Sequence, residues 1–344
     1  MRIGIRVDAN ETIATGHVMR CLAIAEELKK MGENPLFISA DDFPRYLVEQ
    51  KGYELVSLQS DWKFVEEEID RLSKIIEQYN IRMMLVDSYY VTKPYLERIH
   101  ALTKVIYIED LGKDIYDVDA VICYANYYKD FLLVERYPSK VKLLQGTRYT
   151  PLRSVFSNLP PKKMSSEIKN LIVLSGGIDL YDFLWNFSKR IQSSTLFANL
   201  DTINIICGKY YIKYNELVGT FGGNPKFHFY KSVEDIEKYM LTADVAISAA
   251  GVTSYELCAA GVPSIIYTIA DNQKKNAESF HKDGLMEYTG DLRYDLVYDR
   301  IMELMDGKYQ SFIYRENISK EMRKKVDGKG ALRIVREICQ ILYN

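Results

Sequence analysis

The chain has 344 residues, of which 47% are hydrophobic and 27% are charged. This length exceeds that of one ordinary domain and this composition is typical of a globular protein, so disorder, collagen and coiled coil are excluded. The 45 basic and 47 acidic residues give a net charge of −2, which excludes the strongly basic surface that binds nucleic acid or an anionic membrane.

The targeting and redox features of the sequence indicate a cytoplasmic protein. No apolar run reaches the ~18 residues that a membrane span needs, and the first residues lack the apolar region of a signal peptide. The five cysteines are scattered and none forms a C-x-x-C pair, so neither a disulfide framework nor a structural zinc site fits. We therefore expect a cytoplasmic monomer with no membrane and no nucleic-acid partner.

In the first half of the chain, short β-branched runs alternate with longer amphipathic ones. Residues 2–8 alternate apolar and polar side chains, which predicts a strand, and residues 16–30 have the apolar period of a helix. Further strands are expected at 35–39, 83–86, 105–108 and 121–123, and a further helix at 63–79. This order predicts βαβ units and a parallel sheet with helices on both faces.

The pattern breaks at residues 157–163, where two prolines stand beside polar residues and predict a linker. We expect a first domain over residues 1–156 and a second over 165–344, with 333–342 as a candidate helix for crossing back to the first. Two such Rossmann-like α/β domains would face a cleft, with the ligand at the carboxyl ends of the strands, which is the GT-B architecture of B-type glycosyltransferases. In the second domain, strands are expected at 171–174, 203–207, 226–230, 245–248 and 264–267, and a charged helical tail from about 294.

The first candidate site joins the first strand to the first helix. Gly16 permits a tight turn there, and the amides of a helix start can bind an anion. His17 stands in the first helical turn, where the positive end of the helix disfavours the imidazolium, so the ring is suited to act as a general base. A capping or packing histidine is an equal alternative. Asp8 and Arg20 are candidates for ligand contacts. The alternative for Asp8 is to cap the turn, and the alternative for Arg20 is to be a plain surface cation.

Cofactor and metal motifs are absent from the sequence. No G-x-G-x-x-G follows the first strand, which argues against a dinucleotide cofactor. Neither candidate site shows an Asp-x-Asp or a His/Asp cluster, so we expect no metal ion.

The second candidate site lies in residues 243–276. A buried strand runs through small residues, which let a ligand approach the backbone, into a helix that begins near residue 252. Hydroxyls at the helix start are suited to bind phosphate, and a carboxylate in the first turn can accept hydrogen bonds from a ribose. Each residue alone has a plain alternative as a cap or a solvated side chain, whereas the ordered set predicts a nucleotide-sugar site. The residues of this set are Ser248, Gly251, Thr253, Ser254, Glu256, Gln273 and Asn276.

Both segments carry a family resemblance. The second resembles the donor-binding segment of the lipid-linked N-acetylglucosaminyltransferase of peptidoglycan synthesis and its relatives. The first, with Asp8 and the run GHVMR at 16–20, more closely resembles the PseG family, the UDP-sugar hydrolases of the pseudaminic acid pathway. That family usually has glycine where this chain has Ala14, and often aspartate where it has Glu109. Shorter family-like pieces lie at 85–91, 105–111, 146–153 and 175–179.

The resemblance implies a GT-B fold and hydrolysis of UDP-2,4-diacetamido-2,4,6-trideoxy-β-L-altropyranose or a close relative. Water would be the acceptor, the anomeric carbon would be inverted, no metal would be needed, and His17 would be the base. The resemblance also implies ligand contacts from Asp87, Tyr89, Asp110, Arg153 and Gly176. The alternative for Asp87, Tyr89 and Asp110 is to cap the ends of strands. The alternative for Arg153 is an interdomain ion pair, and for Gly176 it is a turn without a ligand.

Two alternative functions stay open from the sequence. One is a GT-B glycosyltransferase that uses a UDP-sugar donor and a sugar or lipid acceptor. The other is a non-catalytic protein that binds a nucleotide sugar.

Overall fold

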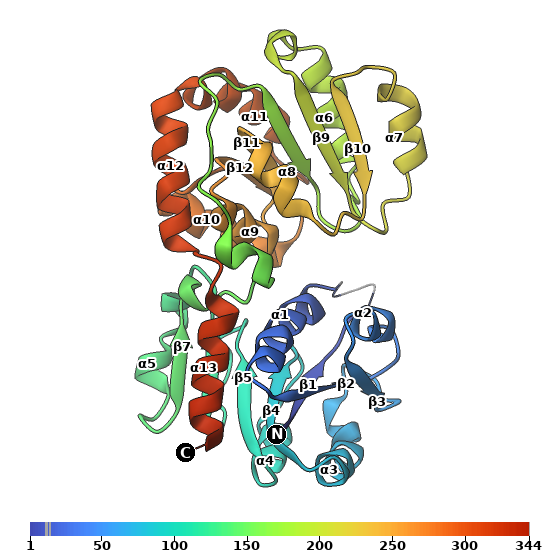
Figure 1. The fold of residues 1–344 in the computed structure, drawn as a ribbon, viewed down its shortest axis with the longest axis vertical. Coiled ribbons are helices and arrows are strands. Elements are labelled where there is room, and N and C mark those ends of the chain that lie inside the picture. Colours follow the sequence, from blue (N-terminus) through green and yellow to red (C-terminus); the bar gives the residue numbers. More distant parts are fainter. Residues whose placement is uncertain (11–12, 14, 344) are drawn as a thin grey trace. The chain divides into compact units, whose positions relative to one another are not determined.

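The computed structural model describes residues 1–10, 13 and 15–343, and the chain divides into two compact units (Figure 1). Unit 1 comprises Met1–Ser157 and Gly328–Asn344, and unit 2 comprises Asn158–Asp327. The second unit therefore ends earlier than the range 165–344 expected from the sequence, because the last helix belongs to unit 1.

Unit 1 is built on a parallel sheet, whose strand order in the described part of the chain is β3-β2-β1-β4-β5-β6-β7. The strands are β1 (Arg2–Val7), β2 (Asn34–Ser39), β3 (Glu54–Ser57), β4 (Ile81–Asp87), β5 (Lys104–Ile108), β6 (Ala120–Cys123) and β7 (Lys142–Gln145). The α-helices are α1 (Gly16–Lys30), α2 (Arg45–Gln50), α3 (Ile69–Gln78), α4 (Lys93–His100), α5 (Leu133–Arg136) and α13 (Gly330–Tyr343). Short 3₁₀ helices lie at Val65–Glu68, Tyr128–Phe131, Thr147–Tyr149 and Ser154–Asn158.

The central strands of unit 1 are apolar because helices cover them. Residues 83–86 of β4 are at most 1% exposed, as expected for a parallel strand that is buried on both faces. Leu72 of α3 and Leu96 of α4 join the same core cluster as Met84 and Val105. Burial of this cluster fixes how the strands are aligned with one another. The carboxyl ends of the strands therefore lie side by side at one edge of the sheet.

The C-terminal helix α13, drawn in red in Figure 1, packs on α1 and on the 3₁₀ helix Thr147–Tyr149. Gly330 begins α13 at a point where a Cβ atom would lie 2.1 Å from the carbonyl oxygen of Thr150. The close approach of the helix to this carbonyl therefore requires glycine.

Unit 2 repeats the architecture with a sheet of order β10-β9-β8-β11-β12-β13, again parallel throughout its described part. The strands are β8 (Asn170–Leu174), β9 (Thr202–Cys207), β10 (Phe227–Lys231), β11 (Val245–Ala249), β12 (Ser264–Thr268) and β13 (Met286–Asp291). The α-helices are α6 (Phe183–Gln192), α7 (Tyr214–Phe221), α8 (Ile236–Thr242), α9 (Thr253–Ala260), α10 (Asp271–Lys282), α11 (Val297–Asp306) and α12 (Phe312–Lys325). Short 3₁₀ helices lie at Thr195–Asn199 and Lys308–Gln310.

The expectation of two Rossmann-like α/β domains is confirmed, since each unit carries a parallel sheet with helices. Sequence analysis did not predict three strands, β3, β7 and β13, and each of them is an edge strand of its sheet. Among the described residues, no helix combines the length and the apolar character that crossing a bilayer requires.

We expect Gly330→Ala to lower the free energy of unfolding by about 1–3 kcal/mol, because the added methyl group overlaps the Thr150 carbonyl and α13 must shift. Gly219→Ala in α7 is the matched control. No atom lies within 4 Å of a Cβ built there, and alanine favours a helix over glycine by up to about 1 kcal/mol. Urea unfolding of both variants measures the difference, and equal losses would contradict this account of α13.

Candidate active site

Four polar side chains of unit 1 meet at the carboxyl edge of its sheet. Asp87 is the last residue of β4, and Asp110 and Tyr124 closely follow the ends of β5 and β6. The helix α1 begins at Gly16 and carries Arg20 to the same place. The strand order β1-β4-β5-β6 brings these residues together, because the carboxyl ends of parallel strands share one edge.

Arg20 is the centre of this group, and all of its hydrogen-bond donors are occupied. A guanidinium has five N–H donors. Two of them reach Asp87, from Nε to Oδ2 at 2.7 Å and from Nη2 to Oδ1. Two reach Asp110, at 3.1 Å from Nη1 and 2.6 Å from Nη2, and the fifth reaches the hydroxyl of Tyr124 at 2.6 Å. In the structure the donors of Arg20 are thus all used within the protein, and a contact of Arg20 with substrate stays a prediction.

The partners of His17 define its tautomer. Its Nδ1 lies 2.6 Å from Oδ1 of Asp87 and 2.9 Å from Nη2 of Arg20. Both Nη2 hydrogens of Arg20 are donated to carboxylate oxygens of Asp87 and Asp110, so neither is left for Nδ1. Because the carboxylate of Asp87 only accepts, we assign the proton of the ring to Nδ1, which donates it to Asp87. Nε2 is then unprotonated, and it has no hydrogen-bond partner among the described residues. A histidine oriented by a carboxylate in this way is the arrangement of a general base.

Burial and charge act in opposite directions on the ionisable groups here. Burial alone would raise the pKa of Asp87, but the charges and hydrogen bonds of Arg20 and His17 hold that pKa well below its ordinary value. Burial, together with the charge of Asp87, raises the pKa of Cys21, whose thiol donates to Asp87 at 3.4 Å. Cys21 therefore stays a thiol and is not a nucleophile.

Tyr89 lies beside the histidine, with its ring edge-on to that of His17 and 4.5 Å between the ring centroids. Burial and the charge of Asp110 raise the pKa of Tyr89, so its hydroxyl keeps its proton at neutral pH. The structure thus brings together at Arg20 four further residues that were expected from the sequence, His17, Asp87, Tyr89 and Asp110.

The expectation that no His/Asp cluster exists is wrong. His17, Asp87 and Asp110 each offer a ligand atom, and these atoms lie within 4.8 Å of one another. The three come from distant parts of the chain, and His17 and Asp87 are 70 residues apart, which is why no local spacing motif reveals them. Their donor set would suit a divalent metal, but the guanidinium of Arg20 bonds to both carboxylates.

Asp8 belongs to a second buried charge cluster in unit 1. Its Oδ1 accepts hydrogen bonds from Nη1 of Arg6 at 2.5 Å and from the amide of Ala40 at 2.9 Å. Arg6 also pairs with both oxygens of Glu68, at 2.7 and 2.9 Å, and Arg6 and Glu68 are fully buried. The carboxylate of Asp8 thus pairs with Arg6 and holds the loop after β2, which differs from the expected cap of the turn after β1. Its contact with a ligand stays a prediction.

The predicted phosphate segment of unit 2 forms a strand, a loop and a helix as expected, with β11 ending at Ala249 and α9 beginning at Thr253. Gly251 is half-buried, and a Cβ built there would meet only Nε2 of Gln273, at 3.9 Å, so the loop has room at this point. The hydroxyl of Ser248 donates to its neighbour's carbonyl oxygen at 3.0 Å.

The start of α9 presents the remaining predicted groups of unit 2. Thr253 and Glu256 are half-buried. Ser254 is fully buried, and its Oγ has no hydrogen-bond partner in the described part of the chain. The amides of Ser254 and Tyr255 are already bonded, at 3.1 and 2.9 Å, to the carbonyl oxygens of residues 251 and 252.

Asn276 and Gln273 hold the loops instead of standing free. The amide oxygen of Asn276 accepts from the hydroxyl of Tyr255 at 2.7 Å, and its Nδ2 donates to the carbonyl oxygen of Ala250 at 3.2 Å. Oε1 of Gln273 accepts from the amide of Ile269 at 3.0 Å. In the structure Asn276 thus holds the loop after β11, and its contact with a ligand stays a prediction. The Nε2 end of Gln273 lies beside Gly251.

The two other predicted residues have plain surroundings. Gly176 is exposed in the turn after β8 with φ +78°, as the turn alternative expects. The guanidinium of Arg153 lies 5.3 Å from the ring centroid of Phe156. The departures from the family pattern differ in outcome: Ala14 lies outside the described residues, and Glu109 accepts from the amides of residues 111 and 112 through Oε1.

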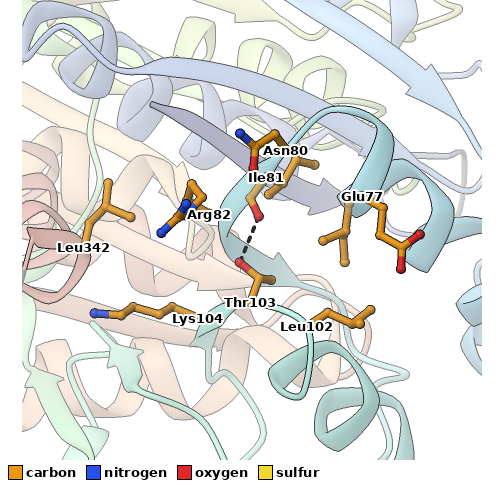
Figure 2. Close-up of a pocket in the computed structure, with 9 residues that line it drawn as sticks. Glu77, Asn80, Ile81, Arg82, Leu102, Thr103, Lys104 and Leu342 are labelled. Atoms are coloured by element: carbon orange, nitrogen blue, oxygen red, sulfur yellow. Dashed lines mark hydrogen bonds between the residues drawn. The ribbon is translucent and has the colours of Figure 1, made fainter.

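A cavity of 380 Å³ lies at the opposite edge of the unit 1 sheet (Figure 2). It is lined by Ile81 and Lys104, the first residues of β4 and β5, and by Leu342 of α13. Thr103 donates from Oγ1 to the carbonyl oxygen of Ile81 at 3.1 Å. Ligands of open parallel sheets bind at the carboxyl ends of the strands, and none of the predicted site residues lines this cavity.

Tyr124 is the cluster residue that sequence analysis missed. It directly follows β6, which ends at Cys123. A polar residue immediately after a buried parallel strand is itself a signal of the functional edge, and this signal would have identified Tyr124 together with Asp87 and Asp110.

Comparison with known proteins finds a glycosyltransferase domain model that matches part of unit 2, and relatives of low sequence identity. Residues 186–324, all within unit 2, match the glycosyltransferase family 28 C-terminal domain. The spore coat polysaccharide biosynthesis protein SpsG of Bacillus subtilis is 24% identical over 351 residues, which cover 100% of this chain and 99% of that protein. An uncharacterized protein of Methanocaldococcus jannaschii is 22% identical over 295 residues, or 82% of this chain; the match spans only 58% of that longer protein.

The fold itself is that of the GT-B glycosyltransferases. The crystal structure of MurG from Acinetobacter baumannii superposes with a TM-score of 0.73 at 14% identity, covering 98% of this chain and 99% of MurG. The fold class expected from the sequence is thereby confirmed.

We expect Asp87→Asn to lower the free energy of unfolding at neutral pH by about 3–5 kcal/mol, because it breaks a buried ion pair. The folded-state pKa of Asp87 is depressed, so its contribution to stability is complete above the unfolded pKa of about 3.9 and is lost as the pH falls toward the folded value. The difference between wild type and variant should therefore shrink as the pH is lowered below about 4.

Urea unfolding between neutral pH and about pH 3 measures this difference. Asp42→Asn, which removes a carboxylate paired with Arg45 on the surface, is the control and should change stability little at any of these pH values. A difference for Asp87→Asn that stays constant over the whole range would contradict the role given to the ion pair.

Proposed function

We propose that this protein hydrolyses a UDP-linked amino sugar at the anomeric carbon, releasing UDP and the free sugar with inversion. The sugar we propose is 2,4-diacetamido-2,4,6-trideoxy-β-L-altropyranose or a close relative, which rests on the resemblance of the His17 segment to the PseG family. The GT-B fold and the match to the family 28 C-terminal domain support the nucleotide-sugar class of substrate.

The observation that carries the proposal is the hydrogen bond from Nδ1 of His17 to Asp87. It leaves Nε2 to accept a proton from the attacking water. Charge supports the same role, because Arg20 balances only one of the two carboxylates that it binds. A proton taken up by His17 makes the cluster neutral, so the imidazolium that forms during the reaction is stabilised where it arises.

In the proposed reaction the oxygen of water forms a bond to the anomeric carbon while the bond from that carbon to the diphosphate oxygen breaks. The proton of the water passes to Nε2 of His17, and the electron pair of the broken bond stays on the β-phosphate. A nucleoside diphosphate needs no strong general acid, but its developing charge must be stabilised. We assign this task to the start of α9, whose amides at Val252 and Thr253 and whose dipole favour an anion.

Further contacts belong to the same proposal. Glu256 would accept hydrogen bonds from the ribose, and Gln273 would contact the diphosphate edge beside Gly251. On the sugar side, Tyr89 and Asp110 flank His17 and would contact hydroxyl or acetamido groups. Contacts from Ser248, Ser254, Arg153 and Gly176 are part of the proposal on the resemblance alone.

A glycosyltransferase is the second candidate function. The match of residues 186–324 to the glycosyltransferase family 28 C-terminal domain favours it. The same base would then deprotonate a hydroxyl group of an acceptor in place of water, so the acceptor requirement distinguishes the two activities.

We expect purified protein to release UDP from a UDP-sugar without any acceptor and in the presence of EDTA, and we expect His17→Ala to abolish this release. The variant should still bind UDP, because His17 lies in unit 1 and the proposed UDP groups lie in unit 2. His100→Ala is the matched control, since that histidine also pairs with carboxylates, at 3.0 and 3.2 Å, but lies on α4.

UDP release is followed by coupled assay or chromatography over a panel of UDP-sugars. Release only after an acceptor is added would favour the glycosyltransferase. UDP binding with no release under either condition would leave a nucleotide-sugar binding protein.

We expect Glu256→Ala to weaken UDP binding by about 1–3 kcal/mol, the loss expected for hydrogen bonds to a charged group. Isothermal titration calorimetry with UDP measures the change. Glu216→Ala is the control, because it removes an exposed glutamate from the first turn of α7 in the same unit. Equal UDP affinity of wild type and Glu256→Ala would place the nucleotide elsewhere.

A further inference from the structure

We propose that Arg20 is a positioning residue. Its guanidinium, which is always charged, occupies the position at which His17, Asp87 and Asp110 would otherwise hold a divalent metal ion. The positioning part rests on the proposed function of His17. The part concerning the metal rests on the geometry of the cluster alone.

The first ground is the donor set around the guanidinium. One imidazole nitrogen and two carboxylates, with their ligand atoms within 4.8 Å of one another, are atom types that bind divalent metal ions. Asp87 is 1% exposed and Arg20 is 6% exposed. The side chain of Asp110 is 20% exposed. Two carboxylates that approach each other at such a partly buried place repel each other unless a cation lies between them, and Arg20 supplies that cation.

The second ground is that every hydrogen-bond donor of Arg20 is used within the cluster. The five N–H donors of Arg20 have five acceptors: both oxygens of Asp87, both oxygens of Asp110 and the hydroxyl of Tyr124. A guanidinium held by two bidentate pairs has one orientation, which a lysine ammonium cannot reproduce because it is a point charge.

The consequence concerns His17. Arg20 fixes both oxygens of Asp87, and Oδ1 of that carboxylate accepts the Nδ1 proton of His17. Arg20 therefore orients the imidazole through Asp87 without needing to touch the substrate. Tyr124 and Asp110, which follow β6 and β5, accept hydrogen bonds from Arg20 and fix its position on α1. Arg20 in turn fixes Asp87 at the end of β4, and Asp87 orients His17 in the first turn of α1.

The metal arm of the test uses Co²⁺, whose protein-bound form absorbs visible light. Wild type, Arg20→Ala and the double variant Arg20→Ala/Asp110→Asn are prepared metal-free and titrated with Co²⁺. We expect an absorption band in Arg20→Ala, no band in wild type, and a much weaker band in the double variant, which lacks one ligand. A band of equal affinity in wild type would overturn the proposal, as would a folded Arg20→Ala without any band.

The positioning arm uses Arg20→Lys, which keeps a cation in the cluster and is therefore expected to fold even if Arg20→Ala does not. We expect no Co²⁺ band, unchanged UDP affinity, and a kcat lowered about 10–100-fold, the usual effect of losing an orienting partner. The acid limb of its pH–rate profile should also shift, which a purely structural role would not produce. Wild-type kcat and pH profile in Arg20→Lys would refute the positioning role.

The two arms separate the inference from the proposed function. If wild type releases no UDP from any UDP-sugar, with or without an acceptor, the proposed catalytic function and the positioning role fail together. The Co²⁺ titration then still decides whether Arg20 occupies a metal position, because that readout requires no turnover.

Discussion

The carboxylate of Asp87 is shared between a guanidinium and an imidazole, and the chemistry of unit 1 depends on this sharing. Buried charges are tolerated only when they are paired and hydrogen-bonded. Arg20 bonds to two carboxylates, so one negative charge in the cluster is left unbalanced while His17 is neutral. The protein thus holds, next to an unprotonated Nε2, an excess charge that one added proton would neutralise.

The fold supplies the cluster through simple geometry. His17 and Arg20 are three residues apart on α1 and therefore lie on one face of the helix. The helix follows β1, and β1 pairs with β4, with Val7 opposite Asp87. One turn of helix thus delivers a base and a cation to the end of the neighbouring strand. The second cluster uses the same principle with its arginine on the strand, because Arg6 of β1 joins Asp8 to Glu68.

The sequence predicts this fold best where burial is complete. The range 16–30 expected for the first helix agrees with α1, and the central strands are recognisable because residues buried on both faces form continuous apolar runs. β3, β7 and β13 were not predicted because each mixes apolar and polar residues and lacks a long apolar run, as the sequences ELVS of β3 and MEYTGD of β13 show. The cluster around Arg20 could not be predicted from the sequence for another reason. It requires the order β1-β4-β5-β6, which no local spacing encodes, so Arg20 reads as a ligand contact until its acceptors are known.

The use of an arginine where a metal ion would fit constrains the rest of the proposed mechanism. A metal ion can lower the pKa of a bound water and can also bind phosphate, whereas a guanidinium whose five donors are occupied does neither. Activation of water must then come from the basicity of His17, and the charge of the departing diphosphate must be stabilised by groups outside the cluster. In unit 2 the start of α9, with room at Gly251 and a dipole that favours anions, has the required character. The proposed mechanism therefore needs two separate devices, the oriented base at His17 for proton transfer and an anion-stabilising helix start for the leaving group.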